Sequence, residues 1–315
     1  TGRFEEAIQQ YNRAIDINPK RDEFYGNLGH ALYEHGRPEE AMQVYHSAID
    51  INPEHAEHHR GYSHASLLTG NLLQGWKEYE WRWRSVQKSQ KRDFKRPLWD
   101  GTPLDGKSIL VYAEQGFGDT IQFIRYIELL PDTGTIIIFA CQPELKRLFK
   151  SIDRIDALVT KGEVISDFDV HIPLLSLPYI FNTTLDSIPS QTPYLYSDIN
   201  SDFAFILDNE DHFKVGIVWA GSSTHVNDRN RSVNLNQFKE LLSIEGCEFF
   251  SLQVGLHRAD ISQNGYDYII KDLGKMFNDF RDTASAILQL DLVISVDTSV
   301  AHLAGALGKE VWTLL

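Results

Sequence analysis

The stretch VISVDTSVAHLAGALG, residues 293–308, decides the fold. It begins with a short β-branched run of the kind that forms a buried strand. Polar residues follow at 297–299, and small residues at 301 and 304–306 would let a helix lie close on a sheet. A buried strand that leads directly into a helix is the unit from which parallel α/β sheets are built.

The turn between that strand and helix is a candidate anion site. N–H groups in the first turn of a helix lack partners within the helix and carry a partial positive charge. We therefore expect the backbone at Thr298, Ser299 and Val300 to hold a phosphate group without a metal ion. Asp297 and His302 flank the turn, although each could instead be a helix cap or a packed side chain.

Alternating strand and helix patterns extend this unit over residues 97–315. The pattern restarts at Lys214, which predicts two Rossmann-like domains, at 97–205 and 206–315. The expected strands are 108–113, 135–140, 157–160, 169–172, 214–219, 247–253, 267–270, 292–296 and 310–315, and the expected helices 119–130, 142–152, 174–182, 234–244, 280–290 and 298–307. Ligands bind beyond the carboxyl ends of such strands, so the candidate loops are 114–119, 220–231, 253–258 and 297–302.

The loop after the first expected strand reads EQGFGD, residues 114–119. Gly116 and Gly118 permit a tight turn and a close approach of the backbone, and Asp119 falls where the helix begins. Taken alone, Asp119 could simply cap that helix. A dinucleotide fingerprint would need glycine at position 121, where the chain has Ile121. This departure argues against an NAD-dependent oxidoreductase.

The second domain contains further candidate ligands. The loop WAGSSTHVNDRNRS, residues 219–232, offers Ser222 and Arg231, and an arginine can bind a diphosphate through paired hydrogen bonds. Gln253, at the end of the next strand, is a candidate nucleotide contact. In the first domain, Asp167 and Asp169 form the Asp-x-Asp pattern of metal–diphosphate sites, without supporting context. We interpret that pattern as chance and expect no metal.

The first hundred residues carry an internal repeat. FEEAIQQYNRAIDINP (4–19) matches PEEAMQVYHSAIDINP (38–53) at an offset of 34 residues, and small residues recur between them at the same offset. This period and pattern resemble a tetratricopeptide repeat, in which small residues let paired helices approach closely. A third unit with three tryptophans, at 76, 81 and 83, is expected to be a capping helix that docks the repeats on the next domain.

Two polar clusters near the end of the repeats have simpler interpretations than ligand binding. Residues 82–96 carry seven basic side chains, but the acidic chain around them favours a solvated helix end and linker over a nucleic-acid site. His55, His58 and His59 have the helical spacing of a metal site. Since the sequence offers them no evident carboxylate or cysteine partner, we expect exposed polar surface. Repeats, capping helix and linker are assigned to residues 1–96.

Composition limits the function classes. The net charge is −14, with 14 Lys/Arg against 15 Asp/Glu in residues 1–100 and 16 against 29 in residues 101–315. This argues against nucleic-acid binding, and an anionic ligand would have to be held by local features. No apolar stretch approaches the about 20 residues of a membrane helix. Cys141 and Cys247 lie in apolar runs and are expected to be buried thiols in a cytoplasmic protein. Both ends look cut, so we expect a fragment with a truncated C-terminal domain.

In combination, these motifs resemble bacterial tetratricopeptide-repeat proteins with a glycosyltransferase family 9-like domain, related to the lipopolysaccharide heptosyltransferases. The motifs that carry the resemblance are LWDGTPLDGK (98–107), GFGD (116–119), VWAG (218–221), NDRNRS (227–232) and DTSVAHLAGALG (297–308). The resemblance implies α-helical repeats followed by a GT-B fold, with an N-terminal Rossmann-like domain for the acceptor and a C-terminal one for a nucleotide-sugar. It also implies inverting, metal-independent transfer without a cofactor.

The resemblance assigns residue roles as well. Asp119 corresponds to the catalytic base, the stretch 297–302 to the donor diphosphate site and Arg231 to a basic phosphate ligand. Heptosyltransferases usually have glycine at the position of Ser299, a departure that concerns the donor sugar. The expected nucleotide-sugar-binding set is Gly116, Gly118, Ser222, Arg231, Gln253, Asp297, Thr298, Ser299, Val300 and His302.

The expected function is transfer of a sugar from a nucleotide-diphosphate-sugar to an acceptor hydroxyl on a glycan, a lipid-linked glycan or a protein. The repeats would bind a protein partner or a protein acceptor. The alternative is a catalytically inactive repeat scaffold that retains the GT-B fold.

Overall fold

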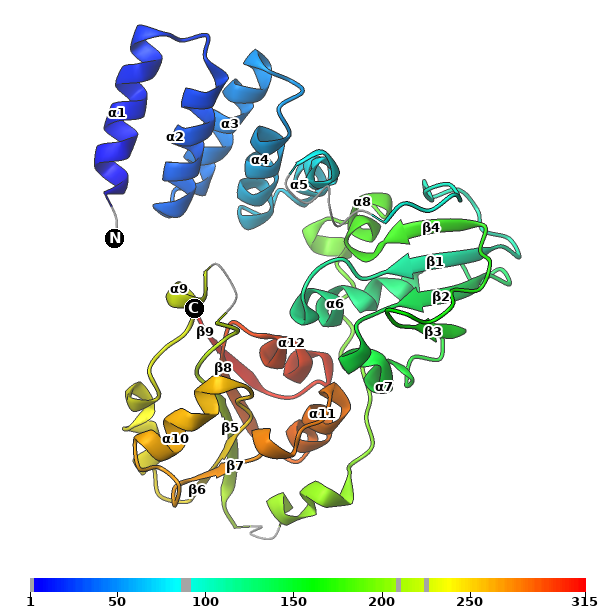
Figure 1. Ribbon diagram of the computed structural model, residues 1–315, viewed down its shortest axis with the longest axis vertical. Helices are drawn as coiled ribbons and strands as arrows, with labels where there is room; N and C mark the ends of the chain where they lie inside the picture. The colour runs from blue at the N-terminus through cyan, green and yellow to red at the C-terminus, as the bar shows by residue number, and fades with distance from the viewer. Residues whose placement is uncertain (1–2, 86–91, 208–210, 224–226) are drawn as a thin grey trace. The chain divides into compact units, whose positions relative to one another are not determined.

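The computed structural model describes residues 3–85, 92–207, 211–223 and 227–315. The chain forms two compact units, which are described separately (Figure 1). The first combines Thr1–Thr102 with Leu175–Pro189, and the second combines Pro103–Leu174 with Ser190–Leu315. The segment 175–189, which the sequence assigned to the first Rossmann-like domain, thus belongs with the repeats.

The first unit is a stack of antiparallel helices. They are α1 (Phe4–Ile17), α2 (Asp22–Glu34), α3 (Pro38–Ile51), α4 (Ala56–Leu68) and α5 (Leu72–Tyr79), with a 3-10 turn at Glu80–Arg84. Tyr45 of α3 lies at the centre of this unit, between two glycines. A Cβ atom at Gly61 would lie 2.3 Å from its ring and one at Gly29 would lie 3.0 Å away. The small residues at the repeat positions therefore let three helices close around one aromatic ring.

The end of the repeat unit differs from the expected solvated helix end. Arg82 is fully buried, and its Nη2 donates a hydrogen bond of 2.8 Å to Oγ of Ser176. Its Nη1 lies 2.6 Å from Oε1 of Glu80, and its guanidinium stacks on the rings of Tyr79 and Trp83. The basic residues at 88 and 91 lie outside the described residues. Arg82 therefore holds the segment 175–189, with its short helix α8 (Leu177–Ile180), against α5.

Two of the three histidines expected on the surface are buried. His58 contacts Asp22 of α2, and His59 contacts Glu78 of α5. Their carboxylate partners lie 36 and 19 residues away in sequence, on other helices. The expectation of exposed polar surface is therefore wrong for both.

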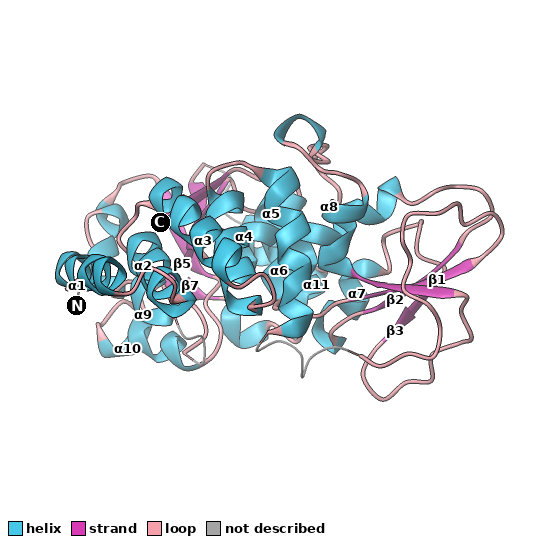
Figure 2. Cartoon of the chain, turned by 90° about the horizontal axis from the view of Figure 1, so that it is seen from above, coloured by secondary structure: helices cyan, strands magenta, loops and turns pink. Residues whose placement is uncertain are grey.

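The second unit contains two parallel sheets. The first has the order β3-β2-β1-β4 and the second the order β7-β6-β5-β8-β9, with all pairs parallel (Figures 1 and 2). The strands are β1 (Ser108–Tyr112), β2 (Ile136–Ala140), β3 (Ala157–Val159), β4 (Val170–Pro173), β5 (Phe213–Val218), β6 (Cys247–Ser251), β7 (Ile270–Asp272), β8 (Leu292–Val296) and β9 (Val311–Leu314). All nine predicted strands have a counterpart, although β7 begins three residues later than predicted and overlaps the stretch 267–270 only at Ile270.

Four predicted helices of this unit are present but shorter than their patterns indicated: α6 (Phe117–Phe123), α7 (Lys146–Phe149), α11 (Phe280–Leu288) and α12 (Ser299–Ala306). The short helices α9 (Asp228–Arg231) and α10 (Asp260–Gln263) were not predicted. The 3-10 turns are Ile124–Leu129, Pro143–Leu145, Ser201–Leu207, Leu235–Phe238, Leu241–Ser243, Leu256–Ala259 and Gly274–Met276. The expected helix at 234–244 is wrong, because two 3-10 turns occupy that stretch.

An aspartate fixes the amino end of a strand pair at three places. Asp156, Asp169 and Asp291 each precede a strand, and each accepts a backbone hydrogen bond of 2.7–2.8 Å from the neighbouring strand. The same three residues donate their own N–H groups back to that neighbour. These reciprocal pairs fix the register of the strands at the edge opposite the candidate loops.

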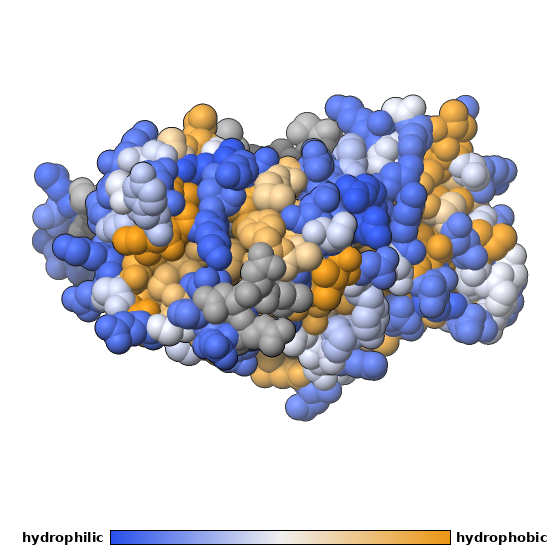
Figure 3. Space-filling model, turned by 90° about the horizontal axis from the view of Figure 1, so that it is seen from below, coloured by the Kyte–Doolittle hydropathy of each residue, from blue (hydrophilic) through white to orange (hydrophobic). Residues whose placement is uncertain are grey.

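Polar residues cover much of the face drawn in Figure 3, with apolar residues between them. Among the described residues, no helix is long and apolar enough to cross a membrane. Cys141 is buried and burial raises the pKa of its thiol to about 12, whereas Cys247 is half-buried at the start of β6.

Candidate functional site

The candidate motifs emerge where the strand order of each sheet reverses. In the first sheet β1 lies between β2 and β4, and its carboxyl end continues into the loop 113–116. In the second sheet β5 lies beside β8, with Val218 opposite Ser295. The loops after β5 and β8 therefore start from neighbouring strands. Such reversal points are where open parallel sheets bind ligands.

Asp119 lies in the first turn of α6 and its carboxylate is held by the loop before it. Gly116 is the N-cap residue of α6, and its N–H donates a hydrogen bond of 3.1 Å to Oδ2 of Asp119. Gln142 reinforces the loop, because its Nε2 donates to the carbonyl of Gln115 and to Oγ1 of Thr120. Asp119 therefore does cap the start of α6, and this hydrogen bond holds one of its carboxylate oxygens in place.

Gly118 is the point where the two sheets' helices touch. A Cβ atom on Gly118 would lie 2.9 Å from Cδ2 of His302 and 3.6 Å from Cα of Ser299. The ring of His302, on α12, occupies the space that a side chain at position 118 would fill. Glycine is therefore required here by the approach of α12, and the motifs after β1 and β8 meet at one place.

Asp119, Asp297 and His302 interact electrostatically. Burial raises the pKa of the Asp119 carboxyl above its usual value; the N–H of Gly116 and the charge of His302 oppose this rise, and Asp297 adds to it. Burial lowers the pKa of His302, and the two carboxylates only partly compensate. Nε2 of His302 lies 4.0 Å from Oδ1 of Asp297. The three side chains thus share one local field, with His302 neutral at pH 7.

Arg125 belongs to the same field, although no sequence motif points to it. Its charge contributes to the lowered pKa of His302. Its Nη2 donates a hydrogen bond of 2.7 Å to the hydroxyl of Tyr194, and its guanidinium lies over the Tyr194 ring. Tyr194 comes from the segment after the first sheet, 69 residues from Arg125, so this contact forms only in the folded chain.

The start of α12 has the geometry of an anion site. Thr298 is the extended N-cap residue, and its hydroxyl pairs with Oγ of Ser295 at 2.9 Å. Ser299 and Val300 are the first helical residues, so their N–H groups have no acceptor within the helix. Asp297 precedes them with its side chain about half exposed. An anion bound here would meet backbone donors and the positive end of the helix dipole.

The loop after β5 folds back on itself and places Arg231. Oγ of Ser232 accepts the N–H of Gly221 at 2.9 Å and donates to Asp228 at 2.7 Å. The guanidinium of Arg231 packs on Gly221, where a Cβ atom would lie 2.7 Å from Nη2. Nε of Arg231 is buried, makes no hydrogen bond within the described chain and lies 4.0 Å from Oδ1 of Asp228. The Arg231 side chain is 21% exposed, and Ser222 lies exposed in the same loop.

Gln253 has a structural role in the described conformation. Its Oε1 accepts the N–H groups of Trp219 and Ala220, and its Nε2 donates to the carbonyls of Ala220 and Val254. These four bonds use the full hydrogen-bonding capacity of the amide. Gln253 thus joins the ends of β5 and β6, and we do not include it among the residues proposed to contact a nucleotide.

The Asp-x-Asp pattern lies at the wrong edge of the sheet for a nucleotide site. Oδ2 of Asp169 accepts the N–H and hydroxyl of Ser108, at the amino end of β1. Asp119 and its loop follow the carboxyl end of the same strand. The interpretation of Asp167 and Asp169 as a chance pattern therefore agrees with a structural role for Asp169.

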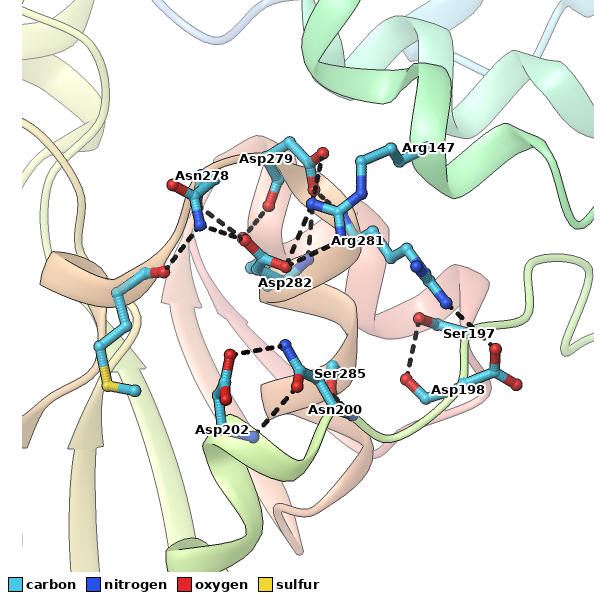
Figure 4. Close-up of polar contacts among 12 residues, drawn as sticks. Arg147, Ser197, Asp198, Asn200, Asp202, Asn278, Asp279, Arg281, Asp282 and Ser285 are labelled. Atoms are coloured by element: carbon cyan, nitrogen blue, oxygen red, sulfur yellow. Dashed lines mark hydrogen bonds and ion pairs between the residues drawn. The ribbon is translucent and has the colours of Figure 1, made fainter.

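A second contact joins the parts of this unit that carry the two sheets. Figure 4 shows Arg147 of α7 pointing toward α11, where its Nη1 lies 3.0 Å from Asp279 and 3.4 Å from Asp282. Arg281 pairs with Asp198 at 3.1 Å. The rings of Phe117 and Phe280, at the starts of α6 and α11, lie 5.0 Å apart. These contacts surround the meeting point of Gly118 and His302 with further links between the sheets.

Comparison with known proteins agrees with this architecture. The family models for the TPR repeat and the tetratricopeptide repeat match residues 1–36 and 22–55. Protein FlbA of Caulobacter vibrioides is 22% identical over 276 residues, which cover 79% of this chain and 46% of that protein. The chain thus spans about half the length of this curated relative.

Solved structures also resemble the chain, and two of them cover the α/β part. A glycosyl transferase family 9 protein from Veillonella parvula has a TM-score of 0.51 and 15% identity, covering 67% of this chain and 82% of that one. ADP-heptose LPS heptosyltransferase II of E. coli has a TM-score of 0.45 and 10% identity, covering 65% and 84%. The chain consists of tetratricopeptide repeats and an α/β part, and the Veillonella structure shows that this α/β part has the GT-B fold of glycosyltransferase family 9.

Proposed function

We propose that the protein is an inverting, metal-independent glycosyltransferase that uses a nucleotide-diphosphate-sugar and an acceptor hydroxyl. The observation that carries the proposal is the contact at Gly118. It brings a desolvated carboxylate, Asp119, beside the start of α12, which is suited to a diphosphate. A base and an anion site that meet from two sheets are what sugar transfer from a diphosphate donor requires.

In the proposed complex, the donor diphosphate lies at the start of α12. The N–H groups of Ser299 and Val300 and the guanidinium of Arg231 donate to its oxygens. Negative charge accumulates on the diphosphate as the bond to the sugar breaks, so these donors stabilise the transition state more than the ground state. They take the role that a metal ion has in other transferases.

Asp119 is the proposed base. It accepts the proton of the acceptor hydroxyl while the oxygen of that hydroxyl attacks the anomeric carbon. The carbon–oxygen bond to the diphosphate breaks, and the nucleoside diphosphate leaves with the electron pair. A single displacement inverts the anomeric carbon. The raised pKa of Asp119 supports this role, because a stronger base removes the proton more readily.

The repeats support a protein partner or a protein acceptor, since tetratricopeptide repeats present concave surfaces for polypeptides. Glycan and lipid-linked acceptors fit the site chemistry equally. We infer a cytoplasmic location from the need for a nucleotide-sugar, and no bound cofactor is required by the mechanism.

The test compares Asp119→Asn with Asp169→Asn. Binding is measured by calorimetry with UDP, GDP, ADP and TDP, and turnover by release of nucleoside diphosphate from the matching nucleotide-sugars, with and without EDTA. We expect Asp119→Asn to lose about 10²–10⁴-fold in turnover while retaining nucleotide affinity. Asp169→Asn and EDTA should change neither.

Three results would contradict the proposal. Unchanged turnover in Asp119→Asn removes the base assignment, and loss of turnover in EDTA removes metal independence. A wild-type protein that binds none of the nucleotides and releases none of the diphosphates is instead a scaffold that keeps the fold without the activity.

A further inference from the structure

Asp22, His55 and His58 lie together on the repeat unit, outside the candidate active site. One ligand atom from each lies within 4.8 Å of the other two. Asp22 begins α2, His55 precedes α4 and His58 lies in the first turn of α4. The cluster therefore joins two helices from successive repeats, and its carboxylate could not be found from histidine spacing alone.

The donor atoms are placed for coordination. Nε2 of His58 lies 3.0 Å from Oδ2 of Asp22, and their side chains are 5% and 14% exposed. Ligand atoms of a tetrahedral zinc ion, at about 2.0–2.2 Å from the metal, are separated by about 3.4 Å. Nδ1 of His55 is buried and makes no hydrogen bond in the described chain, so in the Nε2–H tautomer its lone pair is available to a metal ion.

The surroundings hold the three side chains in this arrangement. The rings of His55 and His58 stack with centroids 3.9 Å apart and planes within 13°. Nδ2 of Asn52 donates a hydrogen bond of 2.9 Å to Oδ2 of Asp22, as outer-shell residues do for metal-binding carboxylates. His58 lies on the backbone of Gly26, where a Cβ atom would be closer than any van der Waals contact.

We propose that Asp22, His55 and His58 bind one divalent transition-metal ion, with zinc as the best-matched ion. Two imidazoles and one carboxylate are a ligand set for zinc, nickel or copper rather than for calcium or magnesium. His55 and His58 line a cavity of about 430 Å³ between α2 and α4, together with His30 and His64. The fourth coordination position is therefore available to water or to a donor atom of a bound partner.

The test is calorimetric titration of the chelator-treated protein with ZnCl₂. We expect one saturable equivalent per chain. Cobalt(II) titration should give the absorption of a tetrahedral site. A protein without saturable zinc binding overturns the proposal.

Matched variants distinguish this site from adventitious binding by surface histidines. His46 pairs with Asp50 at 3.2 Å on an exposed face of α3, without a third ligand, so His46→Gln should leave zinc affinity unchanged. His55→Gln should weaken it by more than the about 10- to 100-fold expected for the outer-shell variant Asn52→Ala. Equal losses in His46→Gln and His55→Gln, or no loss in His55→Gln, overturn the assignment.

His55→Gln breaks no hydrogen bond of Nδ1 but removes the stacking of the His55 ring on His58. The effect of zinc is therefore read against the metal-free melting temperature of each variant. Zinc should then raise the melting temperature of the wild type and of His46→Gln but not that of His55→Gln. A zinc-dependent rise in His55→Gln that equals the wild-type rise contradicts the proposal.

Discussion

Two neighbouring arginines with opposite surroundings, Arg82 and Arg84, give the sharpest test of how the repeat unit holds the segment 175–189. Arg82 is fully buried, bonded to Glu80 and Ser176, and stacked on two aromatic rings. Arg84 pairs with Glu54 at 3.2 Å, but their side chains are 64% and 80% exposed. The two substitutions Arg82→Met and Arg84→Met remove the same charge from one 3-10 turn, Glu80–Arg84.

The magnitude for Arg82→Met follows from what it leaves behind. Removing one partner of a buried ion pair costs about 3–5 kcal/mol, because the other charge stays desolvated. Glu80 is 24% exposed, so water partly solvates it, and methionine preserves the contact of the aliphatic stem with the rings. We therefore expect about 3 kcal/mol for Arg82→Met. An exposed pair such as Arg84–Glu54 contributes about 0–1 kcal/mol.

Hydrogen exchange followed by mass spectrometry measures the stability of individual peptides, so it can detect this difference at the segment 175–189. Global unfolding of a chain with two units cannot assign the change to that segment. Peptides covering α5 and residues 175–189 should exchange about 100-fold faster in Arg82→Met, since each 1.4 kcal/mol is a factor of ten. In Arg84→Met they should exchange at nearly the wild-type rate. Unchanged exchange of residues 175–189 in Arg82→Met would refute the role given to Arg82, as would equal effects of the two variants.

Two further predictions concern the site and the repeats. Burial lowers the pKa of His302, so its imidazole is neutral at pH 7. A bound diphosphate favours the charged imidazole, so the affinity for UDP or the matching nucleotide should rise as the pH falls below 6.5. Calorimetry should find a smaller rise in the affinity of His302→Gln. Gly61→Ala should lower the free energy of unfolding of the repeat unit in urea by about 1–3 kcal/mol, because its Cβ would overlap the ring of Tyr45. Gly305→Ala, which has open space around it, should leave the free energy of unfolding unchanged.

Much of the fold could be predicted because it depends on local patterns. Strands such as β8, with all five residues buried, are continuous apolar runs that need no partner to be recognised. β7 was displaced because the apolar pair Ile269–Ile270 begins in a turn, where both N–H groups bond to the carbonyl of Tyr266. That turn leaves Tyr268 exposed and moves the strand forward in the sequence.

Features that depend on distant pairing could not be predicted. Nothing near Arg82 in the sequence indicates that it would be buried and would donate a hydrogen bond to Ser176, 94 residues later. His58 and Asp22 face each other only because α2 and α4 are neighbours in the stack. In the candidate site, Asp119 and His302 were identified from their own loops. The contact of Gly118 with His302, which brings those loops together, joins elements of two separate sheets. Residue spacing along one helix or strand does not show which other helix or strand will lie beside it.

The aspartates at the amino ends of the strands have an electrostatic consequence for an acidic protein. Asp291 lies at one end of β8 and the turn at 297–300 at the other, roughly 16 Å away at about 3.3 Å per residue. The screening length at physiological ionic strength is about 8 Å. Carboxylates fixed at that edge are therefore about two screening lengths from the anion site. A net charge of −14 can coexist with the proposed diphosphate site because part of that charge serves as structure on the far side of the sheet.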